Sequence, residues 1–312
     1  MSKTIKIEPE NAGARLDLFL TGLYPDISRS KLQAAIKDGR ILLNGKPAKP
    51  HTFLKTDDEI AMPAEKTVAP PAATKLQGRQ DIPFAVIYED DELAVIDKPT
   101  GLLVHPTVQG ETETLAHALV GRWPGLAKVG EAPERPGIVH RLDKEASGLL
   151  VVAKTKKSFA ALKAQFQEHS IEKEYAVLVN GRPPKEADTI SLTIGRSAAG
   201  NRMAARAEAL DENDRPAITH YRVEEYFNGA TLLSVRTETG RTHQIRAHLH
   251  ALGSSVAGDP LYHIKRGPVV ASPRLFLHCR RLAFKHPKTG QRVEFTSPLP
   301  ADLESTLKKL RN

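Results

Sequence analysis

The sequence GIVHRLDKEASGLLVVAKT, at residues 137–155, places a carboxylate, Asp143, a few positions before an unbroken apolar run. Because GLLVVA is apolar at every position, we expect a strand that is covered on both faces. A carboxylate on the loop that enters such a strand needs a cationic partner, since desolvation disfavours its ionised form. Arg141 and Lys144 are neighbours on an extended loop and point in different directions, so a partner from elsewhere in the chain is needed.

A second cationic cluster, ETGRTHQIRAHLH at residues 238–250, offers such a partner. Arg241 follows the predicted strand TLLSVR and precedes a helical pattern, so its side chain can reach another strand-end loop. An arginine about 4 Å from a carboxylate gains on the order of 4 kcal/mol at an effective dielectric of about 20. We therefore predict that Arg241 pairs with Asp143 and keeps it ionised. Spacing alone leaves an alternative open, in which Asp143 only caps a turn and Arg241 faces solvent.

The composition narrows the classes of protein that this chain can be. A formal net charge of +8 over 312 residues favours a polyanionic partner, and nucleic acid is the first candidate, because lysine and arginine release the counterions condensed on phosphates. Apolar runs reach only about six residues, far below the roughly 20 that span a bilayer, and the N-terminus has no apolar export signal. One cysteine, Cys279, excludes a disulfide framework. We expect a cytoplasmic protein with no membrane contact.

Residues 12–62 carry the pattern of a compact module of two helices and a hairpin. Four apolar residues of ARLDLFLTGL follow the i, i+3, i+4, i+7 spacing of one buried helical face: Leu16, Phe19, Leu20 and Leu23. SRSKLQAAIKDG predicts a second helix, with Leu32 and Ile36 inward and its end at Gly39. Asn44-Gly45, between two short extended runs, predicts a hairpin turn.

The second helix and the hairpin of this module carry six cations that can lie along one face: Arg29, Lys31, Lys37, Arg40, Lys46 and Lys49. The order of elements, with SRSKLQAAIKDGRILLNGKP as its signature, resembles the small RNA-binding domain first seen in small-subunit ribosomal protein four. That resemblance implies that the module binds RNA through these cations. The alternative is that the lysines are ordinary solvated surface.

The rest of the chain is predicted to be a linker and one larger domain. Residues 63–80 are rich in Pro and Ala and lack a periodic apolar face, which is typical of an extended linker. Residues 81–312 contain mostly short β-type runs: FAVIY, LAVID, GLLVVAK, YAVLV, TISLTI, ITHYRVEEY and TLLSVR. Two amphipathic helices are expected, one at about residues 157–169 and one at THQIRAHLHALG. Strands in runs predict an α+β fold over a mixed, largely antiparallel sheet.

Six motifs of this chain resemble, in their order and separation, those of the RluA-type pseudouridine synthases: DKPTGLLVHP, HRLDKEASGLLVVAKT, KEYAVLVNG, TGRTHQIRAHL, GDPLYH and LHCRRLAFKHPKTG. The resemblance covers nearly the whole chain, including the N-terminal module and the linker. It implies the pseudouridine synthase fold and an isomerase that converts uridine in RNA to pseudouridine without a cofactor.

The resemblance also implies roles for individual residues. Asp143 of HRLD is the indispensable catalytic group, and Tyr175 of KEY lies against the target base and assists proton removal at carbon 5. Arg241 of TGRTHQIR is expected to pair with the aspartate. Arg141 of HRLD enters the RNA stack when the uridine leaves it, and His140 beside it is expected to contact RNA.

The chemistry of the isomerisation is compatible with these few residue types. Breaking the bond from ribose to nitrogen 1 and joining the base through carbon 5 changes no oxidation state. A carboxylate is ionised at neutral pH and can attack the sugar or the base, or take a sugar proton, and the sequence leaves these routes open. A planar guanidinium suits the gap left by an extruded base, and an aromatic ring contributes about 1 to 3 kcal/mol per stacked base.

Several alternatives follow from the same residues. The resemblance implies large-subunit ribosomal RNA or a pre-ribosomal particle as substrate and a monomeric enzyme, with transfer RNA as the alternative substrate. A non-catalytic RNA-binding ribosome-assembly factor is a rival from another class. A metal-dependent nuclease is a third reading, with five candidate ligands: His140, Asp143, His243, His248 and His250. His243 and His250 are separated by about 10.5 Å along one helix, too far to share an ion, so we predict no metal site.

Overall fold

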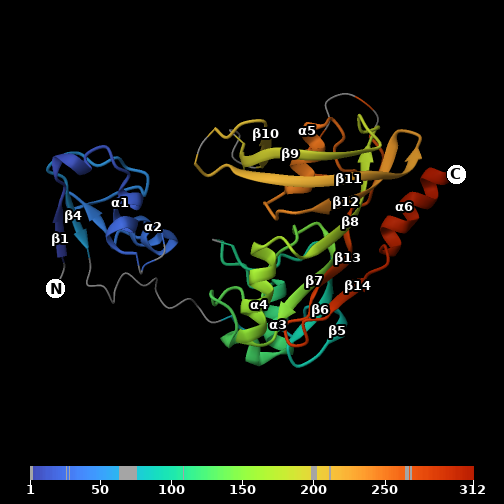
Figure 1. Cartoon of the computed structure of the whole chain (residues 1–312), viewed down its shortest axis with the longest axis horizontal. Coiled ribbons are helices and arrows are strands. Elements are labelled where there is room, and N and C mark those ends of the chain that lie inside the picture. The colour runs from blue at the N-terminus through green and yellow to red at the C-terminus, as the bar shows by residue number, and fades with distance from the viewer. Residues whose placement is uncertain are drawn as a thin grey trace. The chain divides into compact units, whose positions relative to one another are not determined.

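The computed structural model describes residues 3–25, 27, 29–62, 76–107, 109–197, 202–210, 212–263, 267 and 269–312. The chain divides into two compact units, Met1–Lys75 and Leu76–Asn312 (Figure 1). Most of the predicted linker, at residues 63–75, lies outside the described residues. Its last residues, 76–80, belong to the second unit, where the Arg79 amide donates a hydrogen bond to the His117 carbonyl at 2.9 Å.

The N-terminal unit joins two helices to a four-stranded sheet. The helices are α1 (Leu16–Leu23) and α2 (Arg29–Lys37), preceded by a short 3-10 turn, Pro9–Asn11. The strands run in the order β1 (Lys3–Lys6), β4 (Glu59–Met62), β2 (Leu42–Leu43) and β3 (Lys46–Pro47). The predicted hairpin is confirmed, because Asn44 and Gly45 have φ angles of 53° and 72° between β2 and β3. The sequence pattern predicted neither β1 nor β4. These two strands pair antiparallel, and β1 forms one edge of the sheet.

The apolar faces of the two helices form the core of this unit, with one exception. Leu16, Leu20, Leu32 and Ile36 are fully buried, as the periodicity predicts. The expectation for Leu23 is wrong, since its side chain is 48% exposed. Leu23 is the last residue of α1, and the end of this helix extends beyond the residues that cover its apolar face.

A buried carboxylate joins the two helices of the N-terminal unit. The Asp17 side chain has no exposed surface and accepts hydrogen bonds from Arg15 at 3.1 Å, Arg29 at 2.9 Å and Gln33 at 2.6 Å. Burial opposes its ionisation, but the hydrogen bonds from Gln33, Arg15 and Arg29 outweigh burial and lower the pKa of Asp17 to about 2. Arg29, predicted to contact RNA, is therefore also the cation that ties α2 to α1.

The second unit is built on one ten-stranded sheet. Its strand order is β10-β9-β11-β12-β8-β13-β7-β6-β5, with β14 paired to β13. All neighbouring pairs are antiparallel except β13 with β7. The strands span these residues: β5 (Ala85–Glu89), β6 (Leu93–Lys98), β7 (Ser147–Ala153), β8 (Glu172–Asn180), β9 (Ala187–Arg196), β10 (Met203–Arg206), β11 (Arg215–Phe227), β12 (Ala230–Thr237), β13 (Leu277–Lys285) and β14 (Arg292–Thr296). The seven predicted strands are all present, whereas β10, β13 and β14 were not predicted.

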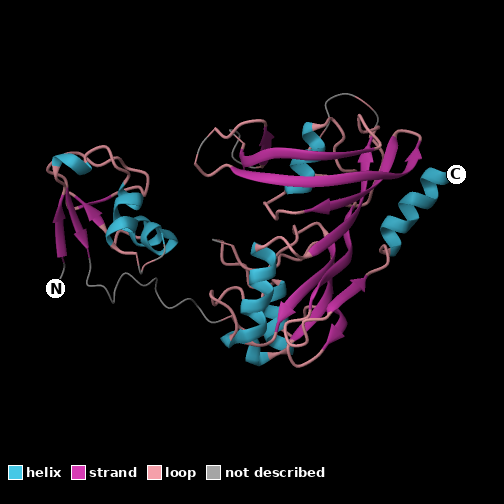
Figure 2. Ribbon diagram, in the orientation of Figure 1, coloured by secondary structure: helices cyan, strands magenta, loops and turns pink. Residues whose placement is uncertain are grey.

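The helices lie on separate parts of this sheet (Figure 2). The two predicted helices are confirmed as α4 (Lys156–Gln167), which packs on β7, and α5 (Gln244–Ala251), which packs on β9, β10 and β11. Two further helices were missed, α3 (Leu115–Arg122) and α6 (Ala301–Arg311). Seven of the eight residues of α3 are buried, so α3 lacks the polar face that marks a helix in a sequence. Within the described residues, no helix is long and apolar enough to cross a membrane.

A glycine sets the distance between the central strands β7 and β13. Gly148 lies opposite Cys279, and a Cβ atom at this position would come within 2.4 Å of the Cys279 carbonyl oxygen. Its φ angle of 114° is one that other residues rarely adopt. On the other side of β13, Cys279 lies opposite Tyr175 of β8. The three strands thus place Tyr175 two strands away from the segment that carries Asp143.

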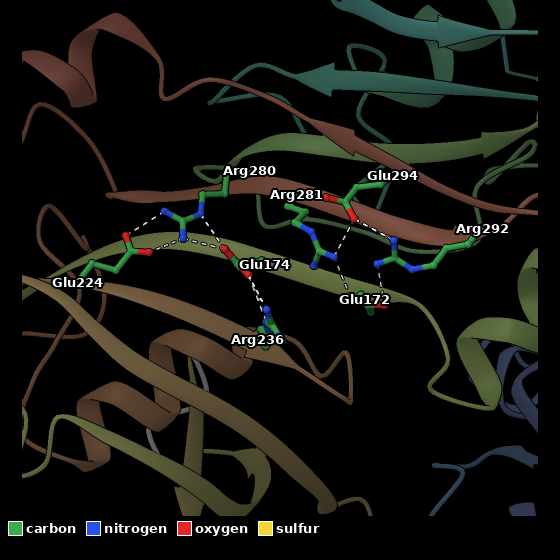
Figure 3. A network of polar contacts seen from close by, with 8 residues as sticks. All are labelled: Glu172, Glu174, Glu224, Arg236, Arg280, Arg281, Arg292 and Glu294. Atoms are coloured by element: carbon green, nitrogen blue, oxygen red, sulfur yellow. Dashed lines mark hydrogen bonds and ion pairs between the residues drawn. The ribbon is translucent and has the colours of Figure 1, made fainter.

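A network of eight charged side chains covers one face of the central strands (Figure 3): Glu172, Glu174, Glu224, Arg236, Arg280, Arg281, Arg292 and Glu294. A register shift between Cys279 and Arg281 leaves Arg280 as an extra residue, so two successive arginines reach the same face. Arg280 bonds Glu174 at 2.7 Å and Arg281 bonds Glu172 at 3.0 Å. The network connects five strands and stabilises their register.

We predict that the substitution Asp17→Asn destabilises the N-terminal unit by about 3 to 5 kcal/mol, because it leaves two arginine partners without a buried counter-charge. Hydrogen exchange of residues 3–62 in the full chain measures this loss. The exposed Asp38, paired with Arg40 at 2.9 Å, is the control, and Asp38→Asn should cost less than about 1 kcal/mol. Since the folded pKa of Asp17 lies below its ordinary value of 3.8, its contribution is present above about pH 4 and disappears as the pH falls toward 2. Equal protection in both variants would contradict this account.

Candidate active site

A cavity of about 610 Å³ opens in the second unit beside the central strands. Asp143 lies on the loop before β7, Tyr175 lies on β8, and both line the cavity. The predicted site residues Arg141, His140 and Arg241 also line it. Segments separated by about one hundred residues in sequence therefore meet here, as the motif order predicts.

The segment DKPTGLLVHP, at residues 97–106, supports the loop that carries Asp143. The Lys98 ammonium is fully buried and donates hydrogen bonds to the carbonyls of Pro99 at 2.8 Å, Leu102 at 2.8 Å and Lys144 at 3.1 Å. The Gly101 amide also donates to the Lys144 carbonyl, at 2.8 Å. Burial lowers the pKa of Lys98 to about 7, although the nearby carboxylates of Asp143 and Glu145 oppose the change. This support fixes the backbone immediately after Asp143.

The cation that pairs with Asp143 is Arg246. Its Nη1 lies 3.2 Å from Asp143 Oδ2, and its Nε and Nη2 lie 2.7 Å and 2.8 Å from the two oxygens of Asp259. The Arg246 side chain is fully buried, and its guanidinium carbon lies 5.1 Å from the centre of the Tyr262 ring. Burial opposes the charge, but the hydrogen bonds to Asp259 and the charge of Asp143 outweigh it and raise the pKa of Arg246. One buried guanidinium thus bridges two carboxylates.

The predicted pair between Arg241 and Asp143 is therefore wrong. Arg241 lies before α5 on an exposed turn, and its Nε donates to the Pro216 carbonyl at 3.2 Å. The turn is fixed by Gln244, whose side chain accepts from the Arg241 amide at 3.0 Å and donates to the Ile218 carbonyl at 2.9 Å. Because the turn is anchored on β11, the first turn of α5 rather than the loop before it points toward Asp143.

Two residues of this arrangement, Arg246 and Asp259, were missed from the sequence. A signal for Arg246 was present, because it lies three positions before Leu249 and next to Ile245, both on the predicted inward face of the helix. An arginine on an apolar face indicates a buried charge that must be paired. Asp259 is the acidic residue of the GDPLYH motif, and the Leu261 and Tyr262 amides hold its carboxylate at 2.8 Å and 3.1 Å.

Tyr175 occupies the interior of the cavity. Its side chain is only 7% exposed, and burial raises its pKa well above the ordinary value for tyrosine. The phenol therefore stays protonated at neutral pH.

The first two residues of HRLD, His140 and Arg141, differ in their availability to a ligand. Arg141 is exposed and lies at the cavity. The His140 ring stacks on Phe166 with a centroid distance of 4.6 Å, and its Nε2 accepts a hydrogen bond from the Val151 amide at 3.0 Å. Burial lowers the pKa of His140 to about 3. His140 is thus a neutral ring whose Nε2 is already bonded to β7.

The cations of the N-terminal unit form two groups. Lys31, Lys37, Lys46 and Lys49 are exposed. Arg29 and Arg40 form ion pairs with Asp17 and Asp38 instead. The four lysines are therefore exposed cations, whereas the two arginines are partly buried and already form ion pairs.

The five proposed metal ligands do not converge. In the part of the chain that the structure describes, no three side chains of His, Cys, Asp or Glu are arranged to hold a metal ion. His248 is buried and its Nδ1 lies 3.0 Å from the Thr219 hydroxyl. The Nδ1 atoms of His243 and His250 lie within hydrogen-bonding distance of Tyr262 and Ser255.

Comparisons with known proteins place the chain in a family. Residues 92–251 match the family model described as RNA pseudouridylate synthase, and residues 14–60 match the S4 domain. A Chloroflexus aurantiacus protein called an uncharacterized RNA pseudouridine synthase is 42% identical over 99% of this chain and 94% of its own length. This chain belongs to the RNA pseudouridylate synthase family.

Further relatives support the same assignment. A Pseudomonas aeruginosa protein named ribosomal large subunit pseudouridine synthase D is 38% identical over 100% of this chain and 96% of its own. The solved structure of human RNA pseudouridylate synthase domain containing 1 matches with a TM-score of 0.58 and 27% identity, over 72% of this chain and 88% of that one. The predicted resemblance, the predicted fold class and the assignment to the isomerases are thereby confirmed. The chain is an RNA pseudouridine synthase.

We predict that Asp259→Asn lowers kcat by about 10- to 100-fold and changes KM little. The substitution removes one of the two carboxylates that hold Arg246, so Asp143 loses its fixed orientation, and small displacements of a reacting group are costly. Tritium release from carbon 5 of labelled uridine, in an RNA that the wild-type enzyme converts, measures the effect. The control is Glu145→Gln, because Glu145 lies 4.0 Å from Arg246 and is 38% exposed, and its kcat should stay within about threefold of wild type. Equal losses in the two variants would contradict the prediction.

Proposed function

We propose that this synthase modifies uridine in large-subunit ribosomal RNA, with Asp143 as its catalytic carboxylate. The observation that carries the proposal is the open cavity that Asp143, fixed by Arg246, lines together with Tyr175. The ribosomal assignment is supported by the relatives named ribosomal large subunit pseudouridine synthase D, which are similar over nearly the whole chain, and by the S4 domain that precedes the catalytic unit.

Asp143 is suited to act on an extruded nucleoside. Its side chain is 14% exposed, so it is shielded from bulk water and yet reaches the cavity. The bond from Arg246 is to Oδ2, and in our proposal the other oxygen, Oδ1, faces the reacting sugar or base. The carboxylate must be ionised to attack the sugar or the base, and it must also be ionised to take a sugar proton. The positive charge of Arg246 favours this form.

The remaining cavity residues have complementary roles in this proposal. Tyr175 stacks against the uracil ring. Because its phenol stays protonated, it is not the base that takes the proton from carbon 5, which corrects the expectation from the sequence. Arg141 fills the gap that the uridine leaves in the RNA stack, since its guanidinium is exposed at the cavity. The lysines of the N-terminal unit bind the RNA backbone and contribute affinity that depends on salt. Arg241 acts as a further cation at the cavity rim rather than as the partner of Asp143.

We predict that Asp143→Asn reduces turnover below detection while the dissociation constant for RNA changes less than about threefold. The substitution preserves the shape of the side chain but removes the nucleophile or base. Single-turnover tritium release and filter binding on the same RNA separate the two effects. Asp188→Asn, on β9 and paired with the exposed Lys185, is the matched control and should retain full activity. Residual turnover near the wild-type rate in Asp143→Asn would exclude the catalytic role and favour a binding protein.

The substrate assignment is tested by mapping pseudouridine in ribosomal and transfer RNA from cells with and without this gene. We expect one or more large-subunit positions to lose the modification in the deletion strain and to regain it with the wild-type gene but not with the Asp143→Asn gene. Loss at transfer-RNA positions alone would replace the ribosomal assignment with the transfer-RNA alternative.

A further inference from the structure

A second charged group lies inside the catalytic cavity, and the roles described above do not use it. Lys173, on β8, is 8% exposed and lines the cavity. No hydrogen bond or ion pair connects its ammonium to any residue in the described ranges. The ammonium instead lies over an aromatic ring, with Nζ 5.6 Å from the centre of the Phe166 ring. Burial lowers the pKa of Lys173 below the ordinary value for lysine.

Lys98 shows what a structural lysine looks like in this fold. Lys98 and Lys173 are the two buried lysines of the described residues. The ammonium of Lys98 has three backbone carbonyl acceptors, so its burial is compensated. The ammonium of Lys173 has none, and at 8% exposure the side chain keeps only limited contact with water through the cavity, which costs stability. A cation kept in this state is suited to a ligand that brings the missing acceptor.

The position of Lys173 indicates which part of the RNA can bring that acceptor. Lys173 and Tyr175 are two residues apart on one strand, so their side chains leave the same face, about 7 Å apart at the backbone. Other cations at the cavity are more accessible: Arg135, Arg141 and Arg241 are exposed, and Lys163 is half-buried and paired with Glu131. The three exposed arginines are placed for phosphates of the RNA backbone, and Lys163 is held by its ion pair with Glu131. Lys173 is less exposed than these residues and leaves β8 on the same face as Tyr175, which favours contact with an extruded base.

We propose that Lys173 donates a hydrogen bond to a carbonyl oxygen of the extruded uracil and stabilises the negative charge that this base carries during the isomerisation. The inference rests on the proposed function of the cavity and adds a residue that contacts the substrate. It does not depend on which RNA is modified, because the extruded base is the same uracil in every substrate.

The charge develops on every route that Asp143 can take. When the bond between nitrogen 1 and carbon 1′ breaks, its electron pair stays with the base, which becomes an anion delocalised over O2 and O4. When the carboxylate instead adds to carbon 6 first, the electrons move to O4. Carbon 5 then bonds to carbon 1′. Any bond that Asp143 has made to carbon 1′ or carbon 6 breaks and returns its electron pair to the carboxylate, or the sugar proton that Asp143 has taken goes back to the sugar. The proton on carbon 5 leaves and nitrogen 1 takes up a proton, so the product is an isomer of the substrate. Lys173 remains protonated throughout, and its contribution is electrostatic.

The test compares three variants on an RNA that the purified wild-type enzyme converts. Lys173→Met keeps the length of the side chain and removes the charge, and its kcat should fall about 100-fold, as for loss of one preorganised donor, with little change in KM. Lys173→Arg keeps the charge and should retain kcat within about tenfold of wild type. The matched control is Lys163→Met at the same cavity, which should remain within about threefold. Because an uncompensated buried charge is removed, the melting temperature of Lys173→Met should equal or exceed that of wild type.

A substrate with one altered atom separates contact from structural support. RNAs carrying 2-thiouridine or 4-thiouridine at the target replace one carbonyl oxygen with sulfur, a weaker acceptor. One of the two should slow the wild-type and Lys163→Met enzymes about tenfold and should not slow Lys173→Met further, since interacting groups give non-additive losses. If both thio substitutions slow Lys173→Met as much as wild type, or if Lys173→Met turns over within threefold of wild type, the inference is wrong.

The two proposals fail in different ways in this experiment. If the wild-type enzyme converts transfer RNA but no ribosomal RNA, the ribosomal assignment fails and the comparison of variants proceeds on transfer RNA. Should Lys173→Met fail to fold, the Lys173→Arg enzyme takes its place in the thio comparison. An equal thio effect in the Arg and wild-type enzymes then supports the contact, and the absence of any thio effect in both contradicts it.

Discussion

The buried guanidinium of Arg246, shared between Asp143 and Asp259, is the interaction on which the rest of the active site depends. A single arginine lies 3.2 Å from one carboxylate and 2.7 Å from the other. Burial opposes the ionisation of Asp259, but the hydrogen bond and charge of Arg246 outweigh it and lower the pKa of Asp259. Asp259 fixes the orientation of Arg246, and Arg246 in turn fixes the position of Asp143 at the cavity.

The scaffold serves this interaction by bringing distant segments to fixed positions. Gly148 allows β13 to approach β7 closely, and the Lys98 ammonium holds the backbone beside Asp143. On the opposite face of the same strands, the arginines and glutamates of the network in Figure 3 connect β8 to β13 and its neighbours. The strand alternation therefore separates two functions of β8. Glu172 and Glu174 stabilise the sheet, while Lys173 and Tyr175 face the cavity.

Much of this architecture could be predicted from local patterns, and the misses have physical causes. The apolar run after Asp143 predicted a covered strand, and all seven residues of β7 are buried. Helix α3 escaped prediction because burial on all sides removes the contrast that periodicity detects. The partner of Asp143 was assigned to Arg241 instead of Arg246, since sequence spacing does not show which turn of a helix faces a distant loop. The isolation of Lys173 is a property of its surroundings and has no signature in the sequence at all.

A crystal structure of the enzyme with bound RNA tests the central claim most directly. The target uridine should carry fluorine at carbon 5, because this base lacks the proton that must leave at the end of the isomerisation. We expect the nucleoside to lie in the cavity against Tyr175, with Asp143 within about 3.5 Å of the reacting sugar or base and Arg246 still bonded to both carboxylates. A nucleoside bound elsewhere, or an Asp143 side chain turned away from Arg246 and from the base, would contradict the account.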